Sequence, residues 1–119
     1  MKKIFLLLAL MFGLSVSAQS YYKEFNAGKY AKALTEKIVS KLNLENPATH
    51  EKLQNATYIY AQSIKKHLLL AEKEGLLQGK SLDEAVKFVI GHYNLQNYFM
   101  GDLKNFLTDV QLEKVRELL

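Results

Sequence analysis

The chain has 119 residues, 16 basic and 12 acidic side chains, a formal net charge of +4 at pH 7 and no cysteine. This length fits one domain with one core, and the absence of cysteine excludes disulfide bonds and a lipid attached to cysteine. No nucleic-acid partner is expected, because the basic excess is small and part of it lies in a segment predicted to be removed.

That segment, residues 1–18, has the three parts of a secretory signal peptide. Lys2 and Lys3 form a positive start, an apolar run follows at residues 4–14, and small residues lead to a cleavage site after Ala18. The run is shorter than the roughly 20 residues of a membrane-spanning helix, so a retained anchor is the weaker alternative. We expect a single helical domain at residues 19–119, periplasmic or secreted, with no stable membrane insertion after cleavage.

The first predicted helix covers residues 27–42. Apolar residues recur with helical spacing on one face, and lysines and other polar residues occupy the opposite face. The apolar face consists of Ala27, Tyr30, Ala31, Leu34 and Ile38. The basic face is interpreted as a solvated surface, with an anionic partner or lipid head groups as alternatives.

The second predicted helix runs from Pro47 to about Glu74. Asn46 suits its N-cap, Pro47 its first position and Gly75 a left-handed C-terminal cap. The predicted core stripe is Leu53, Ala56, Tyr60, Ile64, Leu68 and Ala71. Tyr58 and Leu69 fall on the opposite side, where either a second neighbour covers them or a partner binds.

The third predicted helix begins at the capping box that Ser81 forms with Glu84. Two apolar stripes adjoin along it, which suggests a helix packed on two sides or a subunit interface, and therefore allows a homodimer. The first stripe is Ala85, Val86, Val89, Ile90, Tyr93, Met100 and Leu103, and the second is Phe88, Leu95, Phe99 and Phe106. Gly101 suggests a break near Met100.

The last predicted helix covers residues 109–118 and begins at a second capping box. Thr108 and Gln111 can satisfy each other's backbone N–H groups, and Leu107 has the spacing to pack against Leu112 as a hydrophobic staple. Leu112, Val115 and Leu119, or their neighbours, are expected to be buried. The sequence therefore predicts an all-α fold, a small bundle or helical hairpin arrangement of about four helices after the signal peptide.

No pattern in the sequence indicates catalysis. His50, His67 and His92 are spaced too widely to share a helix face, so structural roles are expected, with no metal and no cofactor. Acidic pairs lie on polar surfaces, and no predicted pocket would raise the pKa of one carboxyl for acid–base chemistry. The protein is expected not to be an enzyme.

Leu107-Thr108-x-x-Gln111 is the motif L-T-x-x-Q. In a small, exported, all-helical chain without cysteine, it resembles the Spy/CpxP-like family of periplasmic chaperones and stress-response modulators. The resemblance implies a helical homodimer whose curved, partly apolar and partly basic surface binds unfolded proteins without ATP. The three motif residues match as the cap of a helix.

A second resemblance covers more of the chain. Lys37-Ile38-Val39-x-x-Leu42-x-Leu44 followed by Asn46-Pro47, with the late L-T-x-x-Q, is similar to a family of uncharacterised exported helical proteins. This resemblance implies an exported protein with a helical fold, and it implies no activity.

The predicted function is therefore non-covalent binding of a protein client, as a chaperone-like protein or envelope-stress modulator. The alternative is a structural or interaction subunit for one envelope partner, and a metal sensor is a third hypothesis. The candidate partner-binding residues are Tyr58, Leu69, Phe88 and Phe99.

Overall fold

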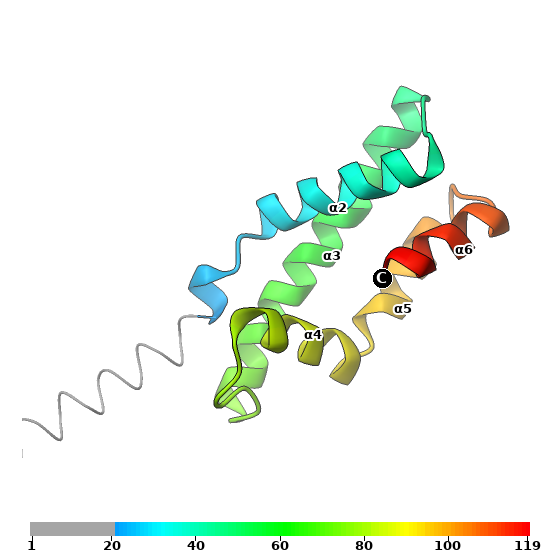
Figure 1. Ribbon diagram of the computed structural model, residues 1–119. Helices are drawn as coiled ribbons and strands as arrows, with labels where there is room; N and C mark the ends of the chain where they lie inside the picture. Colours follow the sequence, from blue (N-terminus) through cyan, green and yellow to red (C-terminus); the bar gives the residue numbers. More distant parts are fainter. Residues whose placement is uncertain (1–20) are drawn as a thin grey trace, which may run out of the picture.

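The computed structural model describes residues 21–119, and within them all regular secondary structure is helical. After a helical turn at residues 21–24 come α2 (Ala27–Leu42), α3 (Pro47–Lys73), α4 (Leu82–His92), α5 (Leu95–Leu103) and α6 (Asp109–Leu118) (Figure 1). The predicted all-α class is confirmed. The predicted signal peptide lies outside the described residues. Among residues 21–119, no helix has both the length and the apolar character that crossing a bilayer requires.

Helices α2 and α3 form a hairpin whose ends are set by three asparagines. The Asn26 side chain accepts a hydrogen bond from the Lys29 N–H at 3.0 Å and caps the start of α2. Asn43 ends α2 in the left-handed region with φ 53°, a conformation that asparagine tolerates better than most residues. Asn46 caps α3 and Pro47 takes its first turn, as the sequence predicts.

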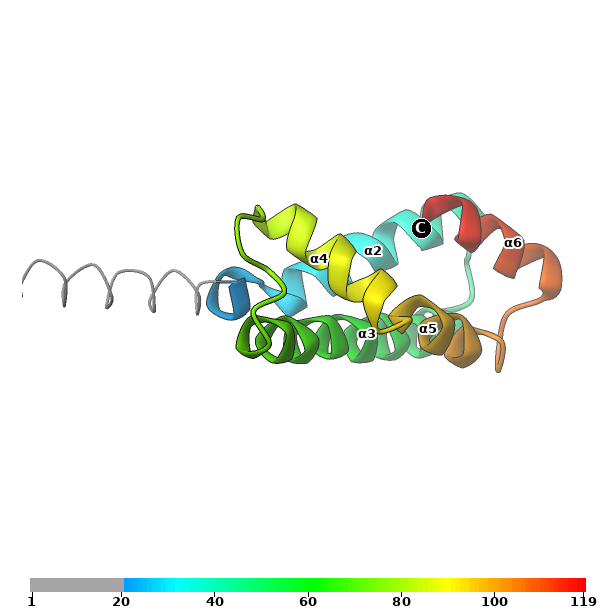
Figure 2. The same ribbon diagram turned by 90° about the horizontal axis from the view of Figure 1, so that it is seen from below.

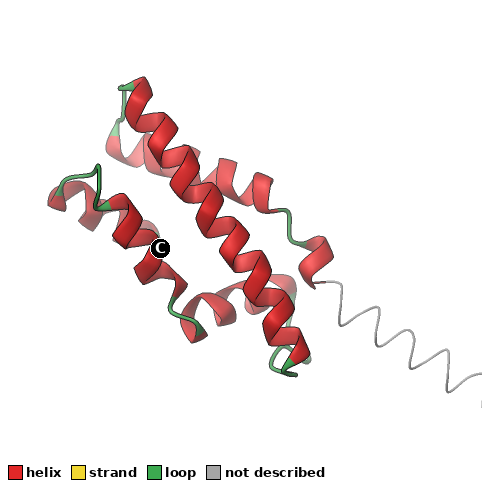
Figure 3. Cartoon of the chain, turned by 180° about the vertical axis from the view of Figure 1, so that it is seen from behind, coloured by secondary structure: helices red, strands yellow, loops and turns green. Residues whose placement is uncertain are grey.

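Helix α3 is the longest helix in residues 21–119, and α2, α4 and α5 all pack on it. Its six predicted core residues are all buried. It ends at Gly75, which has φ +73°, and the Leu76 N–H donates to the Ala71 carbonyl at 3.0 Å. This is the left-handed cap that the sequence predicts. Helix α6, by contrast, packs on α2, and α2, α4 and α6 lie on the same side of α3 (Figures 2 and 3).

The third predicted helix is two helices in the structure, and the predicted position of the break is wrong. The chain breaks at Asn94, which has φ 56°, whereas Met100 and Gly101 lie inside α5. The Tyr93 N–H still bonds to the Val89 carbonyl at 3.0 Å, so α4 is intact up to the break. The left-handed Asn94 then turns α5 along α3, which buries apolar residues on both sides of the break.

Helix α6 folds back from the corner at Leu107 and packs against α2. The Thr108 hydroxyl accepts from the Gln111 N–H at 3.2 Å, and the Gln111 side chain accepts from the Thr108 N–H at 2.9 Å. Leu107 and Leu112 are both buried beside this capping box, which confirms the predicted helix start. Val115 is buried as predicted, but Leu119 is exposed.

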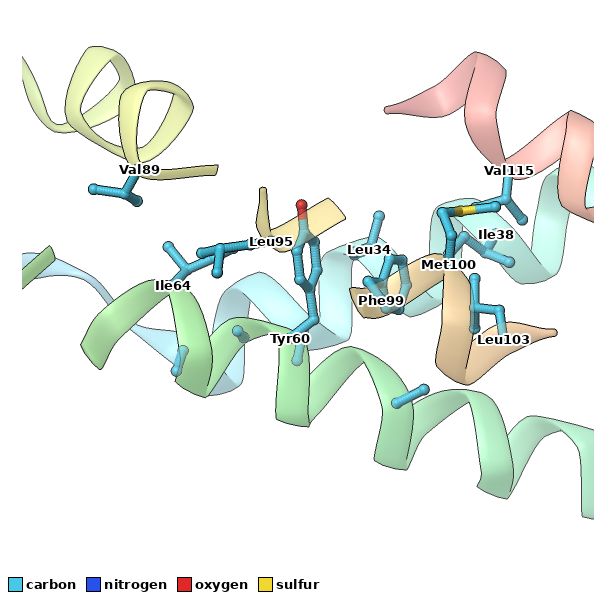
Figure 4. Close-up of a cluster of buried hydrophobic side chains, with 14 of the residues drawn as sticks. Leu34, Ile38, Tyr60, Ile64, Val89, Leu95, Phe99, Met100, Leu103 and Val115 are labelled. Atoms are coloured by element: carbon cyan, nitrogen blue, oxygen red, sulfur yellow. The ribbon is translucent and has the colours of Figure 1, made fainter. Parts of the chain in front are cut away.

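One core joins all five helices (Figure 4). Ile38, Met100 and Val115 meet where α2, α5 and α6 converge. Burial of side chains of this size against one another is the main source of stability in a domain without disulfides.

Candidate binding groove

A groove with a volume of about 570 Å³ lies between α2 and α4. This volume falls within the range typical of ligand-binding clefts. Its apolar walls come from α2, α4 and the end of α6, namely Ala33, Leu34, Val86, Ile90, Leu118 and Leu119. Several of these side chains remain partly or largely exposed, so the groove is open to solvent.

The groove exists because α2 and α4 each pack on α3 at different places along its length (Figure 1). The α2 wall is formed by Tyr30, Ala33, Leu34 and Lys37, and the α4 wall by Asp83, Val86, Lys87, Ile90 and Gly91. Both sets follow the three- and four-residue spacing of one helix face. Helices α2 and α4 therefore each contribute one face to the groove, and α3 contributes its floor.

Tyr60 of α3 forms the floor and is only 4% exposed. Its ring stacks on Phe99 with ring centroids 4.4 Å apart and planes 7° apart, and the Tyr30 ring lies 6.4 Å away. Burial raises the pKa of both phenols above the ordinary value of 10.0, and for Tyr60 the proximity of Tyr30 adds to the effect. Both hydroxyls carry their protons at neutral pH, as an ordinary phenol does, and can act as hydrogen-bond donors.

The rim of the groove carries charge of both signs. Lys37 on α2 and Lys87 on α4 are exposed, and Asp83 lies one turn before Lys87. An apolar centre with a mixed-charge rim is the usual anatomy of a protein–protein contact surface.

A smaller hollow of about 270 Å³ lies across the other side of the α2–α3 contact and includes Tyr58. Beneath it, the hydroxyls of Thr35 and Thr57 form a buried hydrogen bond of 2.6 Å. Tyr58 is 51% exposed, so its predicted outward position is confirmed. Ile59 and Leu70 are also exposed on this helix.

The four predicted partner-binding residues do not form one surface. Phe99 is 1% exposed and stacks on Tyr60 in the core, so its assignment to a contact surface is wrong. The physical reason is the break at Asn94, which turns this side of α5 onto α3. Leu69 is half-buried on α3. Phe88 is half-buried on α4, where its ring stacks on His92 at 5.1 Å and lies 5.2 Å from Lys80 Nζ.

The motif residues Leu107, Thr108 and Gln111 lie at the corner before α6 and do not line the groove. Leu107 is buried, and the side chains of Thr108 and Gln111 bond to each other's backbone N–H groups. The motif therefore acts in this chain by fixing the start of α6. Its effect on the groove is indirect, through the position of Leu118 and Leu119 at the other end of that helix.

The histidines make local contacts. A ring nitrogen of His50 lies 2.7 Å from the Leu44 carbonyl, and Nδ1 of His67 lies 2.7 Å from the Ser63 carbonyl. His92 is exposed beside Phe88. Within residues 21–119, no three His, Cys, Asp or Glu side chains are grouped so that they could hold a metal ion.

Sequence reasoning did not identify the groove. It assigned Tyr30, Tyr60, Val86 and Ile90 to the core, although Tyr30, Val86 and Ile90 are only partly buried and all four line the groove. Two tyrosines on core stripes were the available signal, because a buried phenol needs a partner for its hydroxyl. The hydroxyls of Tyr30 and Tyr60 therefore required either an opening to solvent or a polar neighbour next to the core stripes.

Comparison of the chain with protein-family models, with curated proteins and with solved structures gives no match.

Proposed function

We propose that this protein is an exported, non-enzymatic binding protein that holds apolar segments of other proteins in the groove between α2 and α4, in the manner of a chaperone. The single observation that carries the proposal is the groove itself. Its walls are aliphatic, its volume is about 570 Å³, and it remains open although the domain has buried a core beside it.

A protein segment fits this groove better than a polyanion does. The rim holds two lysines and one aspartate, so it lacks the single-sign charge that a nucleic acid would select. Two parallel rows of side chains at helical spacing present apolar contacts in the middle and charges at the edges, which suits an amphipathic segment laid into the groove. The predicted signal peptide at residues 1–18 supports export, and the L-T-x-x-Q resemblance supports client binding.

The proposal is tested by suppression of aggregation. We would measure light scattering of reduced, unfolding lysozyme with increasing amounts of the purified protein. Ala33→Trp would fill the groove from an exposed position on α2, so suppression should fall strongly. Lys29→Trp is the matched control, because Lys29 is exposed on the same helix and does not line the groove.

Suppression by the unmodified protein and by Lys29→Trp, with loss in Ala33→Trp, is the expected result. No suppression by the unmodified protein would contradict client binding. Loss on Tyr58→Ser or Leu69→Ser, with Ala33→Trp unaffected, would place the contact on the outer side of α3 and contradict the groove. If a pull-down recovers one envelope protein in a stoichiometric amount and not a range of clients, the alternative function as a subunit for one envelope partner would be favoured.

A further inference from the structure

The side of α3 that faces away from α2, α4 and α5 is not covered by another helix of residues 21–119 (Figure 3). Four exposed residues follow each other along this side at intervals of seven, which places them on one helix face. They are Lys52, Ile59, Lys66 and Lys73, and together with Leu70 we call them the outer face. Ile59 is 59% exposed and Leu70 is 42% exposed. The outer face therefore combines exposed apolar side chains with cations.

The charge along the outer face has a single sign. Residues 52–71 contain three lysines and no acidic residue, and acidic residues of α3 occur only at the two ends of the helix. An ordinary solvated helix mixes the two signs, as α6 does where Arg116 pairs with Glu113. At the edge of this side of α3, Lys65 Nζ lies 4.8 Å from the centre of the Tyr22 ring, which adds a further cation. The complementary partner is therefore anionic.

The apolar side chains of the outer face favour a lipid surface over other polyanions. A nucleic-acid duplex would contact the lysines and leave Ile59 and Leu70 without partners. In a helix that lies in a bilayer interface, the apolar side chains enter the head-group region, and lysines beside them extend to anionic head groups. A helix of 27 residues is about 40 Å long, so the outer face can lie along such a surface over several turns.

We propose that the outer face of α3 binds the surface of a bilayer that contains anionic phospholipid. The helix lies in the plane of the surface, with Ile59 and Leu70 at the level of the head groups and the lysines beside lipid phosphates. Because α2, α4 and α6 lie together on the other side of α3, the groove then faces away from the lipid (Figure 2). This inference does not depend on client binding, and it leaves the groove open to a segment in solution.

Vesicle flotation tests the contact. The purified protein is mixed with vesicles of phosphatidylcholine alone or of equal parts phosphatidylcholine and phosphatidylglycerol, and the bound fraction is measured. Binding is expected only to the vesicles with phosphatidylglycerol, and it should fall as salt is added. Lys66→Gln combined with Lys73→Gln should weaken binding about twentyfold, because each lysine near an anionic surface contributes about a fivefold effect. Lys29→Gln combined with Lys114→Gln is the matched control, because it removes the same charge from exposed positions on α2 and α6.

Tryptophan fluorescence tests the orientation, since the chain has no tryptophan of its own. Ile59→Trp places the probe on the outer face, and Ala33→Trp places it in the groove. Vesicles with phosphatidylglycerol should shift the emission of Ile59→Trp to shorter wavelength, because the indole enters the head-group region, and should leave the emission of Ala33→Trp unchanged.

Several results would overturn the inference. These are no binding to vesicles with phosphatidylglycerol, equal binding to phosphatidylcholine alone, equal losses in the two double variants, and an emission shift in Ala33→Trp without one in Ile59→Trp. If a labelled DNA duplex binds and the vesicles do not, the partner is a nucleic acid and the inference is also wrong. Suppression of lysozyme aggregation in solution should be unchanged in the Lys66→Gln and Lys73→Gln double variant, so failure of lipid binding and failure of client binding are distinguishable.

Discussion

At the scale of single residues, two buried hydroxyls pair with each other across the contact between α2 and α3. Thr35 and Thr57 face each other across the α2–α3 contact with their hydroxyl oxygens 2.6 Å apart. Each hydroxyl also lies near a carbonyl of its own helix, 2.7 Å from Ala31 and 3.0 Å from Gln54. The two hydroxyl hydrogens are therefore shared among three possible hydrogen bonds. When one hydroxyl is removed, the other can still donate to the carbonyl of its own helix.

This redundancy predicts an additive pair of substitutions. Thr35→Val and Thr57→Val keep the side-chain shape, and each should lower the free energy of unfolding by about 1 kcal/mol, because one hydrogen bond is lost and the remaining hydroxyl keeps the carbonyl of its own helix. The double variant should lose about twice as much, because both hydrogen bonds are gone. Urea unfolding of the four proteins measures the coupling, and a double variant that loses no more than one single variant would contradict it.

Phe99 tests whether the stacked floor of the groove is part of the core. Phe99→Ala should cost about 3–5 kcal/mol, because a large buried ring is removed. Tyr98→Ala, at the adjacent exposed position, should change stability by less than about 0.5 kcal/mol. Similar, small losses in both variants would show that Phe99 is not buried.

Glu72 makes stability depend on pH. Burial raises the pKa of this carboxyl above its ordinary value of 4.5, although the backbone N–H groups of Tyr22 and Tyr21 act in the opposite direction. A raised pKa means that the folded state prefers the protonated form, so the stabilising contribution is present below about pH 4.5 and is lost as the pH rises. Glu72→Gln should therefore be more stable than the unmodified protein at pH 7, with the difference shrinking toward pH 4. Denaturant unfolding at both pH values is the measurement, and a less stable Glu72→Gln at pH 7 would contradict it.

At the scale of elements, helix ends are set by short-range chemistry, and the break between α4 and α5 is the exception. Ser81, Thr108, Asn46 and Gly75 mark helix ends through bonds within a few residues, so the sequence predicts them. Asn94 has no side-chain cap bond and sits between two apolar stretches that also suit one continuous helix. Burial of Leu95 and Phe99 against α3 decides the break, and that contact is not local.

The backbone at Asn94 gives a direct test of the break. With φ 56°, Asn94→Gly should be neutral or slightly stabilising, whereas Asn94→Ala should cost about 1 kcal/mol. Asn97→Ala is the control, since Asn97 is exposed within α5. Thermal unfolding measures all three, and a gain in stability for Asn94→Ala would indicate a continuous helix in place of the break.

At the scale of the whole molecule, the sequence predicts which face of each helix is buried, but it does not predict how the helices are placed relative to one another. The core stripe of α3 and most of the stripe of α2 were predicted correctly, because helical spacing alone defines them, whereas Tyr30 of α2 is only half-buried. How far apart α2 and α4 lie on α3 depends on packing between distant residues, so the groove could not be predicted. The sequence assigns no role to Lys37 or Lys87, and only the folded chain shows them at opposite edges of one opening.

The central claim is that apolar protein segments bind between α2 and α4, and amide chemical shifts measured during a titration test it most directly. The purified protein, labelled with ¹⁵N, is titrated with unfolded, alkylated lysozyme, and the backbone amides that shift are mapped. We predict shifts concentrated on the groove faces of α2 and α4, around Ala33, Lys37, Val86 and Ile90. Shifts confined to the outer side of α3 around Tyr58 and Ile59, or no shifts at saturating lysozyme, would contradict the claim.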